Sequence, residues 1–449
     1  MARISIFTPT HDTRFLRECY SSIKDQPFDE WVVLLNHGAK AIDFGDARVR
    51  MVQAPAGLPP FVGALKAHAC SLCTGDIFVE LDHDDLLFPD AIAEIKRAFE
   101  DEAVGFVYGN ACNVNADWSK PKPYGAEFGW RHRGARFERR TEDGGLRSED
   151  GGLKTEDGRV RAEELDEHVS FEPSPEAVSR IWYAPNHPRA FRRSVYEAVG
   201  GYRAEMRILD DLDLMCRMYL ATTFKHIDRP LYVYRIHGEN TWLRNNREIQ
   251  ANTMRIYDEY IERMAIRGAG TKGLRCLDLG GRFGGGLPKN GDSPSERGGR
   301  AVQSPFSGRY ASVDLKDADV CCDLNGTWPF ADSSVGVVRA FDVFEHLREP
   351  LHTMRELYRV LAPGGWAFVQ VPSTDGRGAF QDPTHVSFWN ENSFRYYTEA
   401  RFARYIDTPV RFQAVRLFTG AKNADGVCWT SAHLVSLKDG YRPCGKVMV

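Results

Sequence analysis

The run Gly75–Pro89 constrains the fold more than any other part of the chain. It reads Gly-Asp-Ile-Phe-Val-Glu-Leu-Asp-His-Asp-Asp-Leu-Leu-Phe-Pro. Residues 77–81 are mostly apolar and have the length of one buried strand of a parallel sheet. Asp82, Asp84 and Asp85 follow at once, and carboxylates buried this close together are costly unless a cation lies among them.

A helix is predicted directly after these acids. Pro89 suits a first helical turn, and Ile92, Ile95 and Phe99 would share one face. The acids would then lie in a strand-to-helix turn at the carboxyl end of a strand, where open α/β sheets bind ligands. Oxygen ligands of this kind suit Mg²⁺ or Mn²⁺, which commonly bridge to nucleotide phosphates. A solvated acidic turn is the alternative, since Asp is common in turns.

Length and charge limit the class of protein. A chain of 449 residues predicts two or three domains. The net charge of −4 argues against a nucleic-acid partner, which usually requires a basic excess. We expect no membrane span and no signal peptide, because no long apolar run is present and a strand begins near Ile4. The scattered cysteines fit reduced thiols in a cytoplasmic protein, and a homo-oligomer is left open.

The first residues alternate between strand and helix patterns. Apolar runs at 4–8 and 31–35 are separated by a helical pattern through Phe15, Cys19 and Ile23. This alternation predicts a parallel sheet.

Several stretches in order resemble the family 2 glycosyltransferases, which have the GT-A fold. They are residues 4–12, 29–38 and 63–70, followed by the acid cluster. Asp82-His83-Asp84 looks like the DxD motif of that family, and Asp85 extends it. The resemblance covers about the first 240 residues. It implies a UDP-, GDP- or dTDP-sugar donor and a Mn²⁺ or Mg²⁺ ion held by Asp82, Asp84 and Asp85.

The same resemblance assigns the donor site. It implies that Pro9, Thr10 and Asp12 contact the nucleotide, together with Asp82. Many relatives carry an acidic pair after the second strand, whereas this chain has Asn36, so the base is left open.

Two later segments also match the family pattern. Asp210-Asp211 stands at the position of the family's catalytic acids. An inverting transfer needs a carboxylate that removes the proton of the acceptor hydroxyl, and Asp211 is the first choice, with Asp210 in reserve. The alternative is an Asp-rich helix N-terminus. His237 resembles the late His that completes the metal or diphosphate site, although a lone His is often structural.

A tandem seven-residue repeat interrupts this region. Residues 141–147, 148–154 and 155–161 each follow the same polar, Gly-containing pattern. We expect a flexible loop or a small, poorly packed hairpin array at about 134–165 within a domain of residues 1–242. It would be a surface insertion or a substrate gate.

A second α/β domain is predicted over residues 274–449, after a helix and linker at 243–273. Residues 274–281 and 310–315 read as strands, and a helix over 351–361 stops at Pro363-Gly364-Gly365 before another strand. This order resembles the class I SAM-dependent methyltransferases, with a Rossmann-like fold, over about 270–400. It implies S-adenosylmethionine held by four residues: Asp278 and Gly280 at the methionine end, Asp314 at the ribose, and Asp323 near the adenine.

The glycine pattern of this second domain departs from that family. Gly280-Gly-Arg282-Phe-Gly284 carries Arg where the family has its middle Gly. His385 could deprotonate a hydroxyl for methyl transfer, next to an aromatic run that is core or a sugar platform.

The sequence thus predicts an inverting, metal-dependent glycosyltransferase that acts on a glycan, metabolite or protein acceptor. A fused methyltransferase would act on the sugar or acceptor. One alternative keeps the transferase and makes the second domain a degenerate binding module for acceptor or partner. Another is a carbohydrate-recognition protein with no catalysis.

Overall fold

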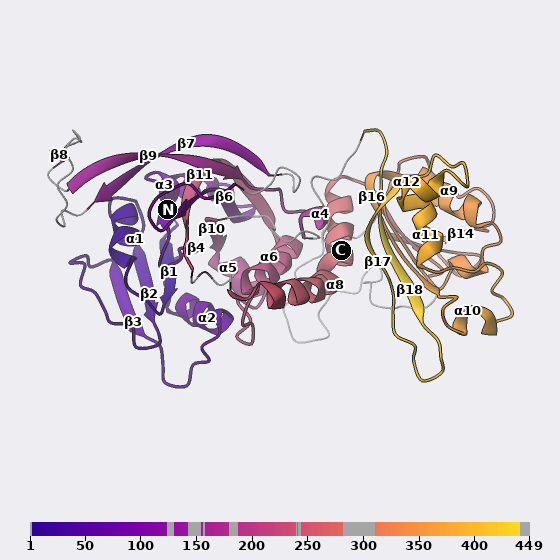
Figure 1. Cartoon of the computed structure of the whole chain (residues 1–449), viewed down its shortest axis with the longest axis horizontal. Helices are drawn as coiled ribbons and strands as arrows, with labels where there is room; N and C mark the ends of the chain where they lie inside the picture. Colours follow the sequence, from indigo (N-terminus) through magenta and orange to yellow (C-terminus); the bar gives the residue numbers. More distant parts are fainter. Residues whose placement is uncertain are drawn as a thin grey trace. The chain divides into compact units, whose positions relative to one another are not determined.

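The computed structural model describes residues 2–123, 130–141, 154–155, 158–178, 187–238, 240, 244–281 and 310–440. The chain divides into two compact units, residues 1–173 with 180–260, and residues 174–179 with 261–449. Each unit has its own sheet and its own core (Figure 1). Most of the predicted repeat and the predicted Arg282 turn lie outside the described residues.

The first unit is built on a sheet of eleven strands in the described part of the chain. Its main path runs β3-β2-β1-β4-β10-β6-β11-β5. The strands are β1 (Ile4–Thr10), β2 (Glu30–Leu35), β3 (Val49–Gln53), β4 (Ile77–Glu80), β5 (Leu86–Leu87), β6 (Val104–Asn115), β7 (Arg131–Thr141), β8 (Lys154–Thr155), β9 (Gly158–Val169), β10 (Arg189–Arg192) and β11 (Thr223–Ile236). The helices are α1 (Leu16–Ile23), α2 (Val62–Leu72), α3 (Ala91–Ala98), α5 (Arg193–Ala198), α6 (Asp210–Ala221) and the first part of α8 (Asn246–Thr271).

The direction of the strands brings the carboxyl ends of β1, β2 and β4 to one edge of the sheet. β1 pairs in parallel with β2 and with β4. β10 runs antiparallel between β4 and β6. The carboxyl ends of β1, β2 and β4 therefore meet, as the alternating sequence pattern predicted.

Helices cover both faces of this sheet because the strand residues alternate in direction. Ile4 and Ile6 belong to a buried cluster that includes residues of α1 and α3. Phe7 belongs to another, which includes residues of α2 and α6. A sheet buried on both faces explains the near-continuous apolar runs that the sequence shows.

The region predicted as a flexible loop or small hairpin array forms strands in its described parts. β7 and β9 form a long antiparallel pair, in register from Arg131 opposite Val169 to Thr141 opposite Arg159. Phe137 and Leu165 are buried, in one cluster with Phe88. The apolar side chains on these strands were too few to stand out in the sequence, but they pack against the sheet.

The second unit contains a seven-stranded sheet in the order β14-β13-β12-β15-β16-β18-β17. Its strands are β12 (Arg275–Leu279), β13 (Tyr310–Asp314), β14 (Val320–Cys321), β15 (Val335–Phe341), β16 (Leu361–Pro372), β17 (Phe412–Thr419) and β18 (Trp429–Ser436). Its helices are α4 (Pro175–Val178), the end of α8, η3 (Phe344–His346), α9 (Pro350–Val360), α10 (Gly378–Gln381), α11 (Glu391–Thr398) and α12 (Ala400–Ala403). The first five strands in this order are parallel to one another. β18 runs antiparallel to both of its neighbours, β16 and β17. The predicted fold class, two mixed α/β domains, is confirmed.

One part of the predicted linker is helical instead. α8 continues to Thr271, through the glycines that were expected to end it. Gly336 of β15 faces this helix: a Cβ added there would lie 2.5 Å from the Cβ of Ala269. The close approach of helix and strand explains glycine at position 336.

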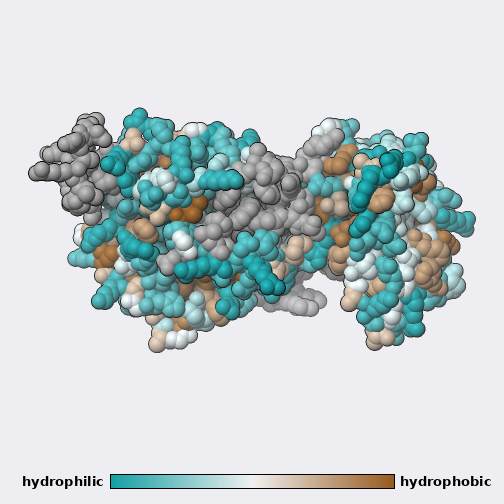
Figure 2. Space-filling model, in the orientation of Figure 1, coloured by the Kyte–Doolittle hydropathy of each residue, from teal (hydrophilic) through white to brown (hydrophobic). Residues whose placement is uncertain are grey.

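The surface fits the mixed composition. Figure 2 shows mostly hydrophilic residues on the visible face, with small and separated hydrophobic areas. Among the described residues, none of the helices combines the length and hydropathy needed to cross a bilayer.

Candidate active site

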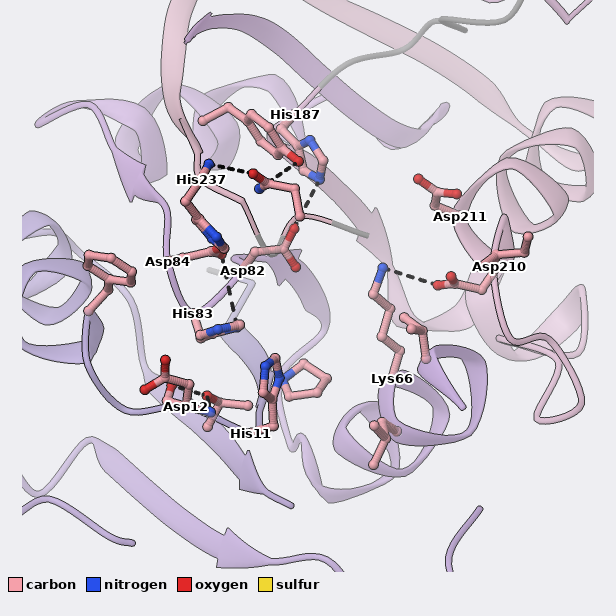
Figure 3. A pocket seen from close by; sticks show the side chains of 18 of the residues that line it. His11, Asp12, Lys66, Asp82, His83, Asp84, His187, Asp210, Asp211 and His237 are labelled. Carbon is pink, nitrogen blue, oxygen red and sulfur yellow. Dashed lines mark hydrogen bonds and ion pairs between the residues drawn. The ribbon is translucent and has the colours of Figure 1, made fainter. Parts of the chain in front are cut away.

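The main cavity of the first unit opens at the carboxyl ends of β1, β2 and β4. Its volume is about 330 Å³. The predicted site residues among those that line it are Pro9, Thr10, Asp12, Asn36, Asp82, Asp84, Asp210, Asp211 and His237. Segments from both halves of the first domain therefore contribute to one site (Figure 3).

The acids after β4 divide into two groups. Asp82 and Asp84 line the cavity, whereas Asp85 does not. Asp85 is 1% exposed, and its Oδ1 accepts a hydrogen bond from the backbone N–H of Arg235 at 2.7 Å. The prediction that Asp85 is a metal ligand therefore does not fit this structure, because its carboxylate anchors the neighbouring strand β11.

His237 lies where it can orient Asp84. Its Nε2 is 2.6 Å from Oδ2 of Asp84, and its ring stacks on Phe15. Burial raises the pKa of Asp84, but the hydrogen bond from His237 and the nearby His83 outweigh it and hold the pKa below its ordinary value. Asp84 is therefore ionised at neutral pH, and its carboxylate is bound by His237.

The pKa of Asp82 is shifted in the opposite direction to that of Asp84. Burial raises its pKa to about 7; Lys66 opposes this rise, while Glu80 and Asp84 add to it. His187 Nε2 lies 3.8 Å from Asp82 Oδ2. A cation placed beside Asp82 would favour its charged form, since an opposite charge stabilises a carboxylate.

A buried network of ion pairs supports the other side of the cavity. Lys66 Nζ of α2 lies 2.6 Å from Glu80 Oε1 and 3.1 Å from Asp210 Oδ2. Arg189 Nη1 of β10 lies 2.9 Å from Asp211 Oδ2 and 3.5 Å from Glu80 Oε2. The two cations thus connect Glu80, at the end of β4, with the two acids at the start of α6.

The two acids of α6 receive different environments. Burial raises the pKa of Asp210 to about 6, against the opposing charge of Lys66. Burial also acts on Asp211, but Arg189 and then Lys66 outweigh it and lower its pKa. Leu209, just before them, has a φ of 58°, a left-handed conformation that is uncommon for a branched side chain and is often kept at functional sites. Asp211 is therefore the acid that is held ionised at the cavity.

The first two loops form the remaining wall. Thr10 is buried, and its Oγ1 donates to the backbone carbonyl of Asp12. Asp12 pairs with Arg14 at 2.7 Å. Asn36 lines the cavity, and its Oδ1 is shielded from solvent without a hydrogen-bond partner among the described residues. An orphaned acceptor at this place is suited to a ligand N–H group.

Sequence reasoning missed four contributors, Lys66, Glu80, His187 and Arg189. Glu80 gave one signal, a charge inside an otherwise apolar strand. Lys66 lay in an ordinary helical pattern. His187 and Arg189 had no feature in the sequence that distinguished them from surface residues.

In the second unit, the predicted cofactor residues lie at the carboxyl ends of three neighbouring parallel strands, β12, β13 and β14. Asp278, Gly280 and Asp314 lie at the carboxyl ends of neighbouring strands β12 and β13, and the Gly280 N–H donates to Val313 O at 2.8 Å. Asp278 Oδ1, however, accepts from Arg339 Nη1 at 3.0 Å.

Asp323 is exposed, and its Oδ1 accepts from the backbone N–H and side-chain amide of Asn325, both at 2.9 Å. It follows β14, which pairs in parallel with β13, and the backbone N–H of the preceding Cys322 donates to the Asp314 carbonyl at 2.9 Å. The predicted hydroxyl base His385 lies beside His346 of η3, with ring centroids 5.0 Å apart.

Comparisons with known proteins agree with this architecture. Residues 5–154 match the family described as "Glycosyl transferase family 2", and residues 304–369 match that described as "Methyltransferase domain". These two matches support a family 2 glycosyltransferase domain fused to a methyltransferase-like domain.

Particular relatives match more weakly. A probable S-adenosylmethionine-dependent methyltransferase of Mycolicibacterium smegmatis is 34% identical over 82 residues, which are 17% of this chain and 30% of that protein. S. aureus TarS 1-349 in complex with UDP-GlcNAc aligns with 58% of this chain and 72% of that chain, at 12% identity and a TM-score of 0.37. The mannosyltransferase PcManGT of Pyrobaculum calidifontis, in complex with GDP-Man and Mn²⁺, aligns with 58% of this chain and 68% of that chain, at 15% identity and a TM-score of 0.35.

Proposed function

We propose that the first domain transfers a sugar from a nucleotide-sugar donor to a hydroxyl group of a glycan, metabolite or protein acceptor, with inversion at the anomeric carbon. The observation that carries this proposal is the meeting of Asp82 and Asp84 with Asp211 in one cavity. The match of residues 5–154 to family 2 supports the class of reaction.

A divalent cation fits this site through Asp82 and Asp84. Both carboxylates line the cavity, and they offer the hard oxygen ligands that Mn²⁺ and Mg²⁺ prefer. Such an ion, when bound, offsets the charge of the donor's diphosphate as it departs. His237 contacts Oδ2 of Asp84 and would orient that carboxylate, as hydrogen-bond partners of metal ligands commonly do.

Asp211 is the proposed base. It stays ionised beside Arg189 and lies at the cavity wall. It accepts the proton of the acceptor hydroxyl while that oxygen forms its bond to the anomeric carbon, and the bond to the diphosphate breaks with its electron pair on the phosphate oxygen. Asp210 is less suited, because its side chain is 5% exposed, against 18% for that of Asp211.

The donor nucleotide would lie against the first two loops. Pro9, Thr10 and Asp12 line that part of the cavity. Asn36 Oδ1, which has no partner among the described residues, would accept from a base N–H, as both uracil and guanine offer one.

For the second domain we propose methyl transfer to the sugar or acceptor. The match of residues 304–369 and the strand order of the sheet support it. S-adenosylmethionine would supply the methyl group, and Asp314, at the end of β13, would accept hydrogen bonds from its ribose. Calorimetry with this cofactor separates the proposal from a binding-only module: binding that Asp314→Ala weakens at least 10-fold supports it, and no binding to the full chain contradicts it.

The transferase proposal is tested by hydrolysis of a panel of UDP-, GDP- and dTDP-sugars with Mn²⁺. We expect one donor class to be turned over, and EDTA to abolish the activity. Asp84→Asn should remove the Mn²⁺ response, and Asp211→Asn should lower transfer by about 10²–10⁴-fold. Asp43→Asn, an exposed acid outside the cavity, is the matched control and should leave the rate unchanged.

Full activity in EDTA would contradict the metal, and full activity of Asp211→Asn would contradict the base. Nucleotide-sugar binding without any turnover would favour carbohydrate recognition alone.

A further inference from the structure

A second group of metal-ligating side chains lies in the methyltransferase-like domain, independent of the glycosyltransferase site. It consists of Glu345, His346 and His385, whose ligand atoms all lie within 4.8 Å of one another. Glu345 and His346 belong to η3, which follows the carboxyl end of β15. That end shares its sheet edge with the ends of β12 and β13, since these strands are parallel.

Glu345 is the most unusual member. It is 2% exposed, and both carboxylate oxygens are shielded from solvent without a hydrogen-bond partner among the described residues. The backbone N–H groups of Val386 and Ser387 donate to the Glu345 carbonyl, not to its carboxylate. A buried carboxylate without a donor is costly, and a bound cation is one arrangement that satisfies it.

The two imidazoles are held in the tautomer that a metal requires. His385 Nδ1 donates to the Ala379 carbonyl at 3.2 Å. His346 Nδ1 lies 3.2 Å from the Thr384 carbonyl and 3.1 Å from the Thr384 hydroxyl, which donates its own hydrogen to Asp382 Oδ1 at 2.7 Å. Because a carbonyl can only accept, each Nδ1 carries the hydrogen and each Nε2 keeps its lone pair. A hydrogen bond from the second ring nitrogen to a carbonyl is the usual support of a metal-bound histidine.

Charge at the cluster also favours a cation. Asp382 Oδ2 lies 3.9 Å from His385 Nε2, and Asp342 is three residues before Glu345. In the described part of the chain, no Lys or Arg forms an ion pair with Glu345. His346 is exposed, so an ion can enter from solvent.

We propose that Glu345, His346 Nε2 and His385 Nε2 bind one divalent transition-metal ion, with Zn²⁺ as the best chemical fit. Two imidazoles and one carboxylate are a frequent zinc ligand set, which leaves a further position open. A tetrahedral ion with bonds of about 2.0–2.1 Å holds its ligand atoms about 3.4 Å apart, so modest side-chain rotation closes the site. The open position would bind an oxygen of a ligand at the same sheet edge. In this assignment His385 is a metal ligand and not the free base that the sequence predicted.

The test uses the full chain, freed of metal with EDTA and titrated with Co²⁺ as a spectroscopic probe. We expect one equivalent to give the intense visible absorption of a four- or five-coordinate site, without a sulfur charge-transfer band, and Zn²⁺ to displace it. His346→Ala, His385→Ala and Glu345→Gln should each weaken binding at least about 100-fold. His346 is exposed, so its variant separates loss of a ligand from loss of folding.

Two matched controls exclude other sites. His352→Ala removes a histidine of α9 outside the cluster, and Asp84→Asn removes the candidate cation site of the first domain. Both should retain the Co²⁺ spectrum. Wild-type affinity in both His346→Ala and His385→Ala, or loss of the spectrum in Asp84→Asn, would overturn the proposal.

Discussion

Replacement of Lys66 by Met tests the buried ion pairs that support the glycosyltransferase cavity. Lys66 Nζ lies 2.6 Å from Glu80 and 3.1 Å from Asp210, and the Lys66 side chain is 9% exposed. At an effective dielectric of about 20, these distances correspond to gross attractions of about 6 and 5 kcal/mol. Burial of the ammonium group offsets much of this, and removal of one partner from a buried pair costs about 3–5 kcal/mol in measured cases.

We therefore expect Lys66→Met to lower the stability of the first domain by about 3–5 kcal/mol. For a domain of about 250 residues this corresponds to a decrease in Tm of about 6–20 °C. Differential scanning calorimetry of the full chain measures this decrease in Tm as a shift of the unfolding transition of the first domain. Lys96→Met, in the partly exposed helix α3, is the matched control and should change stability by no more than about 0.5 kcal/mol.

A double variant shows whether charge or packing is responsible. Glu80→Gln in the Lys66→Met background removes one of the two carboxylates that lose the charge of Lys66. The double variant should therefore be at least about 1 kcal/mol more stable than the sum of the two single changes predicts. A loss below about 1 kcal/mol for Lys66→Met, or simple additivity of the pair, would refute the reasoning.

Three further outcomes are expected. The folded pKa of Asp210, about 6, lies above its ordinary value of 3.8, so the folded state binds more protons between these values and stability falls as pH rises from about 4 to about 6. In Asp210→Asn, the free energy of unfolding should fall by about 3 kcal/mol less over this pH range. Unfolding at several pH values measures this, and an unchanged slope of stability against pH would contradict it. Gly336→Ala should destabilise the second domain by about 1–3 kcal/mol, because the new methyl group would lie 2.5 Å from Ala269; Gly326→Ala, with its nearest atom at 3.5 Å, should be much milder in the same thermal scan. Arg235→Gln should remove the hydrogen bond from Arg235 Nε to the Asp84 carbonyl and the ion pair with Glu18. It should therefore lower stability by about 1–3 kcal/mol, with equal loss in urea and thermal unfolding, since a buried charged donor is removed.

Local patterns in the sequence determined the two α/β sheets, the acid cluster after β4 and the acids of α6. Apolar runs of strand length, separated by helical periods, fix which segments form strands, because side-chain spacing is a local property. The end of a strand is equally local, so Asp82 and Asp84 could be placed at the ligand edge before any contact was known.

Only the tertiary structure decided which charged groups meet. Lys66 and Asp210 are distant in sequence, as are Arg189 and Glu80, and no local pattern predicts such pairs. The same reason explains two contacts that the sequence did not predict: Asp85 accepts from the backbone of β11, and Asp278 is paired with Arg339. Burial and pairing depend on segments that the chain brings together from far apart, and the charge state of a carboxylate depends on both.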